Sequence, residues 1–140
     1  MSEAWYGRMR ELYDRSPVHA ALGMRLGELG PGNAEVVFTP SEQVMNVHGA
    51  VHGGTLATVA DSALLQSVRT LTGEGDRLVT LELKINYVAP ARGEEFRCVG
   101  RVVRVGRSSG VATATVHDAD GTPVAIALGT IHITRGKGVA

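Results

Sequence analysis

The segment NVHGAVHGGTLATVADSA, which starts at Asn46, contains the residues of this chain that are best suited to chemistry. Gly49, Gly53 and Gly54 lie directly before a stretch with helical periodicity. The first turn of a helix exposes up to four N–H groups and carries a partial positive charge. Because glycine has no Cβ, a ligand oxygen can approach these N–H groups closely. The pattern indicates either an anion or oxyanion site, or glycines that only supply turn dihedrals.

A carboxylate, Asp61, lies inside the same predicted helix among small and apolar neighbours. Such a group is either an ordinary solvent-facing aspartate or one that is hydrogen-bonded and used. At about 1.5 Å per residue, Gly53 and Asp61 lie about 12 Å apart along one helix. Two antiparallel copies of the helix would bring the start of one beside the middle of the other. Joint action of the two groups therefore requires a symmetric dimer with two composite sites.

The helix that must position these groups is expected from Gly54 to about Leu71, with Gly73 as its stop. One of its faces is formed by residues at helical spacing, many of them small: Leu56, Ala60, Ala63, Leu64, Ser67 and Leu71. Small residues allow close approach to a sheet, so we expect this helix to be central and mostly buried.

Strand patterns flank this helix on both sides. The segment GMRLGELGPGNAEVVFTP, residues 23–40, predicts two strands joined at the breaker cluster from Gly30 to Asn33. Four further alternating runs, RLVTLELKINYVAP, EEFRCVGRVVRVG, GVATATVHDADG and PVAIALGTIHITR, predict an antiparallel meander, with DADG as a hairpin turn. The fold class is α+β, with a five- or six-stranded antiparallel sheet wrapped around one long central helix.

The N-terminal segment predicts a separate amphipathic helix within residues 1–16, followed by a single domain at residues 17–136. Its apolar stripe is formed by Trp5, Met9, Leu12 and Tyr13. This stripe needs a surface on which to pack, and we expect the helix to cover part of the domain.

Whole-chain properties exclude several classes. The 140 residues have zero formal charge and few aromatic residues, which argues against nucleic-acid binding. We find no apolar leader and no stretch long enough to cross a bilayer, so we expect a cytoplasmic protein without a membrane partner.

The one cysteine, Cys98, is expected to be a buried hydrophobic residue. His48 and His52 lack the glutamate of a helical zinc motif, and we expect neither metal nor cofactor.

These residues resemble a known family, the hotdog-fold acyl-CoA thioesterases of the PaaI type. The family pattern is a polar amide, a glycine, His-Gly-Gly and an acidic residue on the central helix, and here it is matched by Asn46, Gly49, His52, Gly53, Gly54 and Asp61. The segment LVTLELKINYVAPA is similar to the family's strand after the helix. The resemblance extends from about Val18 to Arg135 and implies the hotdog fold.

The resemblance implies hydrolysis of an acyl-CoA thioester to a free acid and coenzyme A without metal. By position, the Gly53 N–H would hold the oxyanion, and Asp61 of the facing subunit would be general base or nucleophile. Thr80 corresponds to the residue that holds the water or the carboxylate, and Asn46 to the amide near the carbonyl. His52 is expected to orient the loop rather than to act as a base, and a purely structural role is a further alternative.

For the substrate, we expect aryl or medium-chain acyl groups, and contacts from Gly54, Leu65, Val68 and Pro90. Coenzyme A phosphates need cations, which outnumber acids from Lys84 onward: Lys84, Arg92, Arg97, Arg101, Arg104, Arg107, Arg135 and Lys137 against Glu94, Glu95, Asp118 and Asp120. Arg107, Ser108 and Ser109 in one predicted turn are the first candidates for phosphate contacts. A homodimer is the minimum assembly, and we expect a homotetramer.

Two other functions remain open. A hotdog enoyl-CoA hydratase or dehydratase would share the fold and the ligand, but its proline-rich loop after a catalytic histidine is absent here. A non-catalytic acyl-CoA binding module would not need Asp61 and Thr80 near the ester. The G-x-S-x-G match at Gly106–Gly110 joins two predicted strands, whereas a nucleophile elbow joins a strand to a helix.

Overall fold

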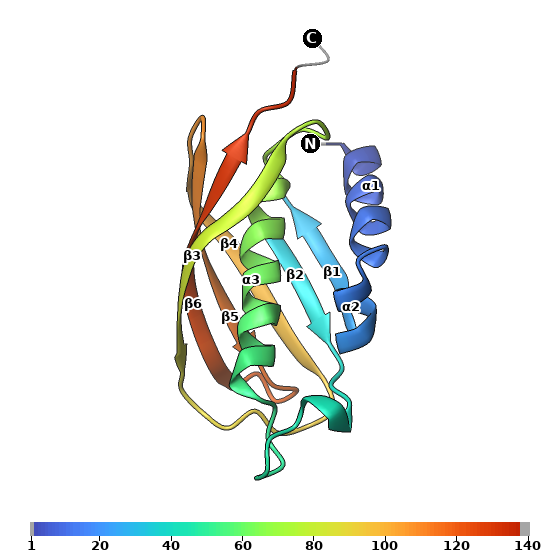
Figure 1. The fold of residues 1–140 in the computed structure, drawn as a ribbon, viewed down its shortest axis with the longest axis vertical. Helices are drawn as coiled ribbons and strands as arrows, with labels where there is room; N and C mark the ends of the chain where they lie inside the picture. Colours follow the sequence, from blue (N-terminus) through green and yellow to red (C-terminus); the bar gives the residue numbers. More distant parts are fainter. Residues whose placement is uncertain (1, 138–140) are drawn as a thin grey trace.

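A six-stranded antiparallel sheet curves around one long helix in the computed structural model, which describes residues 2–137 (Figure 1). The helices are α1 (Glu3–Asp14), α2 (Pro17–Leu22) and α3 (Gly53–Arg69), with a single 3-10 turn at Glu42–Val44. The strands are β1 (Met24–Gly30), β2 (Asn33–Phe38), β3 (Arg77–Tyr87), β4 (Phe96–Val105), β5 (Ser109–His117) and β6 (Pro123–Thr134). The predicted α+β class and hotdog architecture are confirmed.

The central helix α3 lies directly on the sheet because small residues face each other there. Ala60, Ala63 and Leu64 are almost completely buried. A Cβ built on Gly100 of β4 would overlap the backbone carbonyl of Ala63. The absence of a side chain at Gly100 therefore sets the distance between helix and sheet. Of the predicted apolar face, only Leu71 lies beyond the helix, where it is partly exposed.

The order of strands in the sheet is β1-β2-β4-β5-β6-β3. Only β4, β5 and β6 form the expected meander, so the prediction of a meander of all four late strands was wrong. The chain leaves β3 and crosses to the other side of the sheet before β4 begins, and β3 pairs with β6 instead. As a result β3 is an edge strand, with one side free of hydrogen-bonded neighbours in the described chain.

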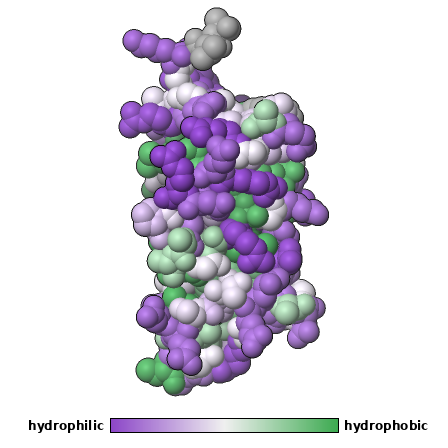
Figure 2. Space-filling model, turned by 90° about the vertical axis from the view of Figure 1, so that its right-hand side faces the viewer, coloured by the Kyte–Doolittle hydropathy of each residue, from purple (hydrophilic) through white to green (hydrophobic). Residues whose placement is uncertain are grey.

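The N-terminal helix packs on the open side of the sheet next to β1 (Figure 1). Trp5, Met9 and Tyr13 are buried, while Leu12 is 37% exposed. The Trp5 indole N–H donates to the carbonyl of Arg69 at 3.2 Å, which ties α1 to the end of α3. Figure 2 shows the face that carries α1 and α2, where hydrophilic residues predominate and apolar ones form separate spots. The predicted amphipathic stripe therefore contributes to the core.

The turns follow the predicted residue chemistry. Gly23 ends α2 with a positive φ of 75°. At the β5–β6 turn, Asp118 Oδ1 accepts the Asp120 and Thr122 N–H groups.

Cys98 is completely buried, as expected, and burial raises the pKa of its thiol. Among residues 2–137, no helix combines the length and apolar character needed to cross a bilayer.

Candidate functional site

The start of α3 leaves one backbone donor without an acceptor. His52 is the N-cap, and its Nδ1 accepts the Gly54 N–H at 3.1 Å. The carbonyl of His52 accepts the N–H groups of Thr55 and Leu56. Within residues 2–137, no group accepts a hydrogen bond from the Gly53 N–H. The histidine therefore fixes the first turn while the Gly53 donor stays available to a ligand.

Tyr87 covers the Gly53 backbone from the end of β3. Its hydroxyl donates to the carbonyl oxygen of Gly53 at 2.6 Å. A Cβ on Gly53 would lie 3.1 Å from the ring carbon that carries this hydroxyl. The glycine thus allows close contact between the helix start and the ring. Sequence reasoning assigned Tyr87 no role, because this contact joins residues 34 positions apart.

The loop before α3 is organised by Asn46. Its Oδ1 accepts the N–H groups of His48 and Ala50 at 2.9 and 3.1 Å. The positive φ of Gly49, 76°, closes this turn. The carboxamide oxygen is therefore used within the loop, and only the NH₂ group of Asn46 remains to contact a carbonyl or water. Arg92 adds a charge here by donating to the His48 carbonyl at 2.7 Å.

A cavity of about 580 Å³ lies at this end of the molecule. Asn46, Gly53 and Pro90, which the sequence singled out, all line it. Its other walls come from residues that include Tyr87 and Arg92. The cavity therefore combines a free backbone donor, an amide, a phenol and a cation with apolar walls.

Asp61 lies on a different part of α3. Its Oδ1 accepts the Thr80 hydroxyl at 2.6 Å, and both side chains are partly buried. A hydrogen bond to a carboxylate oxygen holds that group in one orientation and leaves its second oxygen free. Asp61 and Leu65 line a smaller cavity of about 220 Å³ between α2 and α3. The pair of Asp61 and Thr80, expected from the resemblance, is thus side by side in one chain.

The two parts of the candidate site do not meet within one chain. Gly53 lines the larger cavity and Asp61 the smaller one, and no residue lines both. About 12 Å of helix separates the two positions. A reaction that uses both must therefore involve a second subunit.

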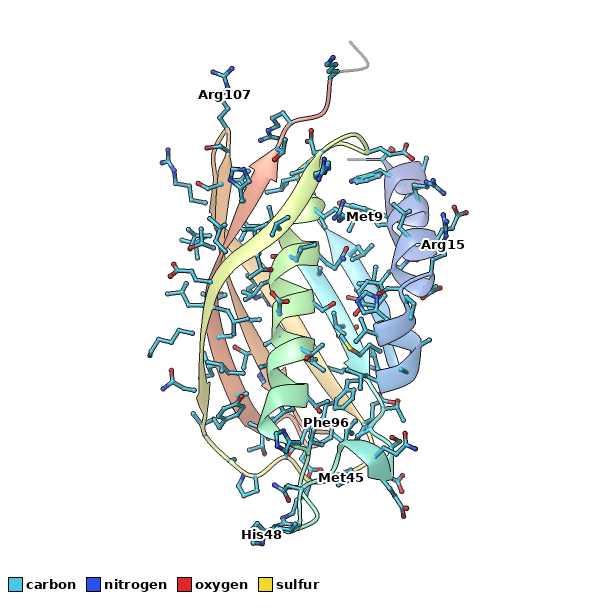
Figure 3. The ribbon with its side chains drawn as sticks, in the orientation of Figure 1. Met9, Arg15, Met45, His48, Phe96 and Arg107 are labelled. Carbon is cyan, nitrogen blue, oxygen red and sulfur yellow. The ribbon has the colours of Figure 1, made fainter. Side chains whose placement is uncertain are left out.

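The remaining predicted contacts are spread over the fold. Gly54 is exposed and donates to His52 rather than lining the larger cavity. Val68 is completely buried in the core, where it faces Gly110, and it lines none of the cavities described here. Arg107 lies in the β4–β5 turn at one end of the molecule, and His48 at the other (Figure 3). In one chain, the turn with Arg107, Ser108 and Ser109 is therefore far from Gly53.

Within residues 2–137, histidine, cysteine and acidic side chains form no group of three that could hold a metal ion. His48 and His52 both lie near the start of α3, but His52 uses its Nδ1 as the helix cap. The chemistry available at this site is that of backbone donors, an amide, a phenol and a carboxylate.

Comparisons with known proteins show the family to which this chain belongs. Residues 48–125 match the family model of the thioesterase superfamily. The chain is 25% identical to the acyl-coenzyme A thioesterase PaaI of Escherichia coli K12 over 137 residues, which cover 97% of this chain and 96% of the relative. It is 27% identical to the medium/long-chain acyl-CoA thioesterase YigI of the same strain, with coverage of 81% and 83%. A crystal structure of a thioesterase family protein from Silicibacter pomeroyi superposes with a TM-score of 0.89 at 34% identity, covering 94% of this chain and 99% of that one.

Proposed function

Because this chain belongs to the thioesterase superfamily and is a thioester hydrolase, we propose that it cleaves acyl-CoA at a site shared by two subunits. The proposed substrates carry aryl or medium-chain acyl groups, and the products are the free acid and coenzyme A. The observation that supports this site best is the unengaged Gly53 N–H in the wall of the larger cavity. A donor fixed in this way is ready to stabilise the oxyanion of a tetrahedral intermediate.

In the proposed mechanism, the thioester carbonyl oxygen accepts the Gly53 N–H at the positive end of α3. Asp61 of the facing subunit acts either as general base, taking a proton from water, or as nucleophile that forms an anhydride. Thr80 positions Asp61 through the 2.6 Å hydrogen bond. The NH₂ group of Asn46 contacts the carbonyl or the attacking water, and His52 holds the helix start in place.

The free edge of β3 supports a dimer of the required geometry. An exposed edge strand of 11 residues offers unpaired backbone groups to a second strand. Val79 and Leu81 of β3 are 57% and 63% exposed, so the free edge carries two large apolar side chains that a second subunit would bury. Antiparallel pairing of two β3 edges would also make the two α3 helices antiparallel. Further pairing of such dimers into a tetramer remains part of the proposal.

Coenzyme A binding is proposed on the same dimer. Antiparallel subunits bring the β4–β5 end of one chain toward the α3 start of the other. This arrangement would let Arg107, Ser108 and Ser109 of the partner reach phosphates outside the cavity. Arg92, which lines the larger cavity directly, is a second candidate cation.

The two alternative functions, hydration or dehydration and acyl-CoA binding without catalysis, require different residues in the site. A hotdog hydratase or dehydratase pairs a catalytic histidine with the acid, whereas in one chain His52 accepts from the Gly54 N–H and Asp61 accepts from the Thr80 hydroxyl. A pure binding module has no use for a carboxylate held beside the ester. Both observations favour hydrolysis over these alternatives.

The test is release of free thiol from a panel of aryl and alkyl acyl-CoA substrates, measured for the wild type and Asp61→Asn. We expect the wild type to turn over at least one class. The rate should fall by about 10²- to 10⁴-fold in the variant, the contribution typical of a general base. A folded Asp61→Asn protein with full activity would reject the proposed mechanism, and enoyl-CoA hydration without thiol release would favour the hydratase.

A further inference from the structure

The face of α3 that carries Asp61 continues toward α1 as a second cavity. This cavity has a volume of about 230 Å³ and is lined by Met9, Leu12, Tyr13, His19, Gln66 and Arg69. His19 and Gln66 also line the smaller cavity that contains Asp61. The two spaces therefore lie next to each other along α3, and we refer to them together as the groove. Met9 points from α1 toward α3 at its far end (Figure 3).

Arg69 at the far end of the groove has no anionic partner. Its side chain is partly buried, and burial lowers the pKa of its guanidinium. Among residues 2–137 no carboxylate forms an ion pair with it, and Asp76, which acts on it only at longer range, is paired with Arg135. A cation removed from water without a counter-charge is costly. The groove thus ends in an unneutralised positive charge.

Gln66 is a second unsatisfied group in the same groove. Its side chain is 8% exposed and its amide oxygen is shielded from solvent without a hydrogen-bond partner. Its NH₂ group donates no hydrogen bond to another group within residues 2–137, and it is the part of the amide that can bind an anion. A buried polar group without a partner destabilises the folded state. Gln66 and Arg69 lie three positions apart on α3 and so project from the same side of the helix.

The neighbouring aromatic pair gives the groove a fixed wall. The rings of Tyr13 and His19 stack with centroids 3.6 Å apart. His19 Nδ1 donates to the Tyr13 carbonyl at 2.7 Å, and the Tyr13 hydroxyl forms a 2.7 Å hydrogen bond with Ser62. The polar atoms of Tyr13 are therefore occupied. Those of Gln66 and Arg69 remain for a ligand.

We propose that the acyl groups hydrolysed at Asp61 include chains with a carboxylate at the far end, which Arg69 binds with help from the NH₂ group of Gln66. This inference rests on the proposed function, because the groove starts at the carboxylate that would attack the thioester. The ligand class is an ω-carboxyacyl-CoA, the monothioester of a dicarboxylic acid. Its chain would lie along α3, against the Tyr13–His19 wall.

The length of the groove sets the preferred chain. Asp61 and Arg69 are eight residues apart, or about 12 Å along the helix axis. Arginine side chains tilt toward the helix N-terminus, which shortens the distance to the guanidinium. At about 1.2 Å per bond of an extended chain, a dicarboxylic acid of roughly eight carbons fits this spacing.

The test is calorimetric binding to the full-length chain with Asp61→Asn, which slows hydrolysis and makes the readout independent of turnover. The probes are suberoyl-CoA, with a terminal carboxylate, octanoyl-CoA of equal length, and free coenzyme A. We expect suberoyl-CoA to bind at least tenfold more tightly than octanoyl-CoA. Adding Arg69→Met should bring this ratio to about one, and Arg69→Lys should restore part of it. Arg15→Met, which removes a cation from exposed α1–α2 surface, should leave the ratio intact.

Three outcomes would overturn the proposal. Equal binding of suberoyl-CoA and octanoyl-CoA would show that the groove does not read a terminal carboxylate. A loss of free coenzyme A affinity in Arg69→Met that equals the loss for suberoyl-CoA would assign Arg69 to the phosphates. If none of the probes binds, the proposal that the groove binds a terminal carboxylate is rejected. If only the proposed function is wrong, suberoyl-CoA will still bind more tightly than octanoyl-CoA, but the wild type will release no thiol.

Discussion

At the scale of single residues, the proposed site depends on one N–H group that has no acceptor within residues 2–137. Gly53 is the first residue of α3, and His52 caps the next donor rather than this one. The free N–H is a consequence of this local geometry, and it lies in the wall of the larger cavity. The role of Gly53 can therefore be tested by a substitution that removes this hydrogen, compared with one that keeps it.

Gly53→Pro removes this donor with little cost to the helix. Proline is favoured at the first helical position, and His52, at φ −61° and ψ 138°, has the backbone conformation that proline requires of its predecessor. Gly53→Ala adds a similar Cβ beside Tyr87 but keeps the N–H. We expect kcat of the proline variant to be about 10²- to 10³-fold below that of the alanine variant. Equal kcat values in steady-state assays would argue against an oxyanion role.

Thr80 acts through Asp61, and its effect should appear in kcat. Thr80→Val preserves the shape but deletes the hydroxyl that donates to Asp61. Since a hydrogen bond to a charged group contributes about 1.5–3 kcal/mol, kcat should fall about tenfold or more while KM changes little. Thr80→Ser should keep most of the activity. A change confined to KM, or an equal loss in the serine variant, would contradict the positioning role.

Residue chemistry could be predicted from the sequence where it is local. Residues 49–61 contain the glycines, His52 and Asp61. The positions of these residues relative to the helix therefore follow from the sequence pattern alone. Tyr87 reaches Gly53 only through the folded sheet, and no local signal shows it. Val68 was expected to contact substrate, but it is completely buried in the core. The pattern shows which helix faces are apolar, but not which of them meets the sheet.

At the scale of elements, the position of α3 depends on close contact with the sheet. Gly100 of β4 lies against the backbone of Ala63, so an added methyl group has no space. We expect Gly100→Ala to lower the free energy of unfolding by about 1–3 kcal/mol or more, because backbone atoms must shift. Urea denaturation measures this change. Stability equal to the wild type would mean that the helix is less closely packed than described.

Gly7→Ala is the matched control. Gly7 lies in α1, and a Cβ there would meet no atom within 4 Å. Alanine has the higher helix propensity, so this variant should gain up to about 1 kcal/mol. A loss at Gly7 would show that α1 is not helical in solution.

The positions of helices and strands along the sequence were predicted better than the pairing of the strands in the sheet. Helical spacing of small residues indicated α3, and glycine-bearing turns separated the strands. The position of β3 was missed, because alternation shows which side of a strand is buried but not which strand lies beside it. The segment after Tyr87 that crosses to the start of β4 has no pattern that distinguishes it from a long hairpin loop.

At the scale of the whole molecule, one chain holds two halves of the proposed site at separate places. The larger cavity contains the Gly53 donor, and the Asp61–Thr80 pair lies beside a different cavity. The spacing of Gly53 and Asp61 in the sequence already indicates that the two groups are far apart on one helix. The pairing surface was not predictable, because it depends on β3 being an edge strand. The free edge and its exposed Leu81 are visible only in the folded sheet.

The central claim is that Gly53 of one subunit and Asp61 of its partner serve one site, and mixed dimers test it most directly. Gly53→Pro and Asp61→Asn proteins should each be nearly inactive. After subunit exchange of equal amounts, about half of the dimers are hybrids, each with one intact site, so thiol release should return to about a quarter of the wild-type rate. If hybrids form, as mass spectrometry of differently tagged chains would show, and the rate stays at the level of the separate variants, the shared site is contradicted.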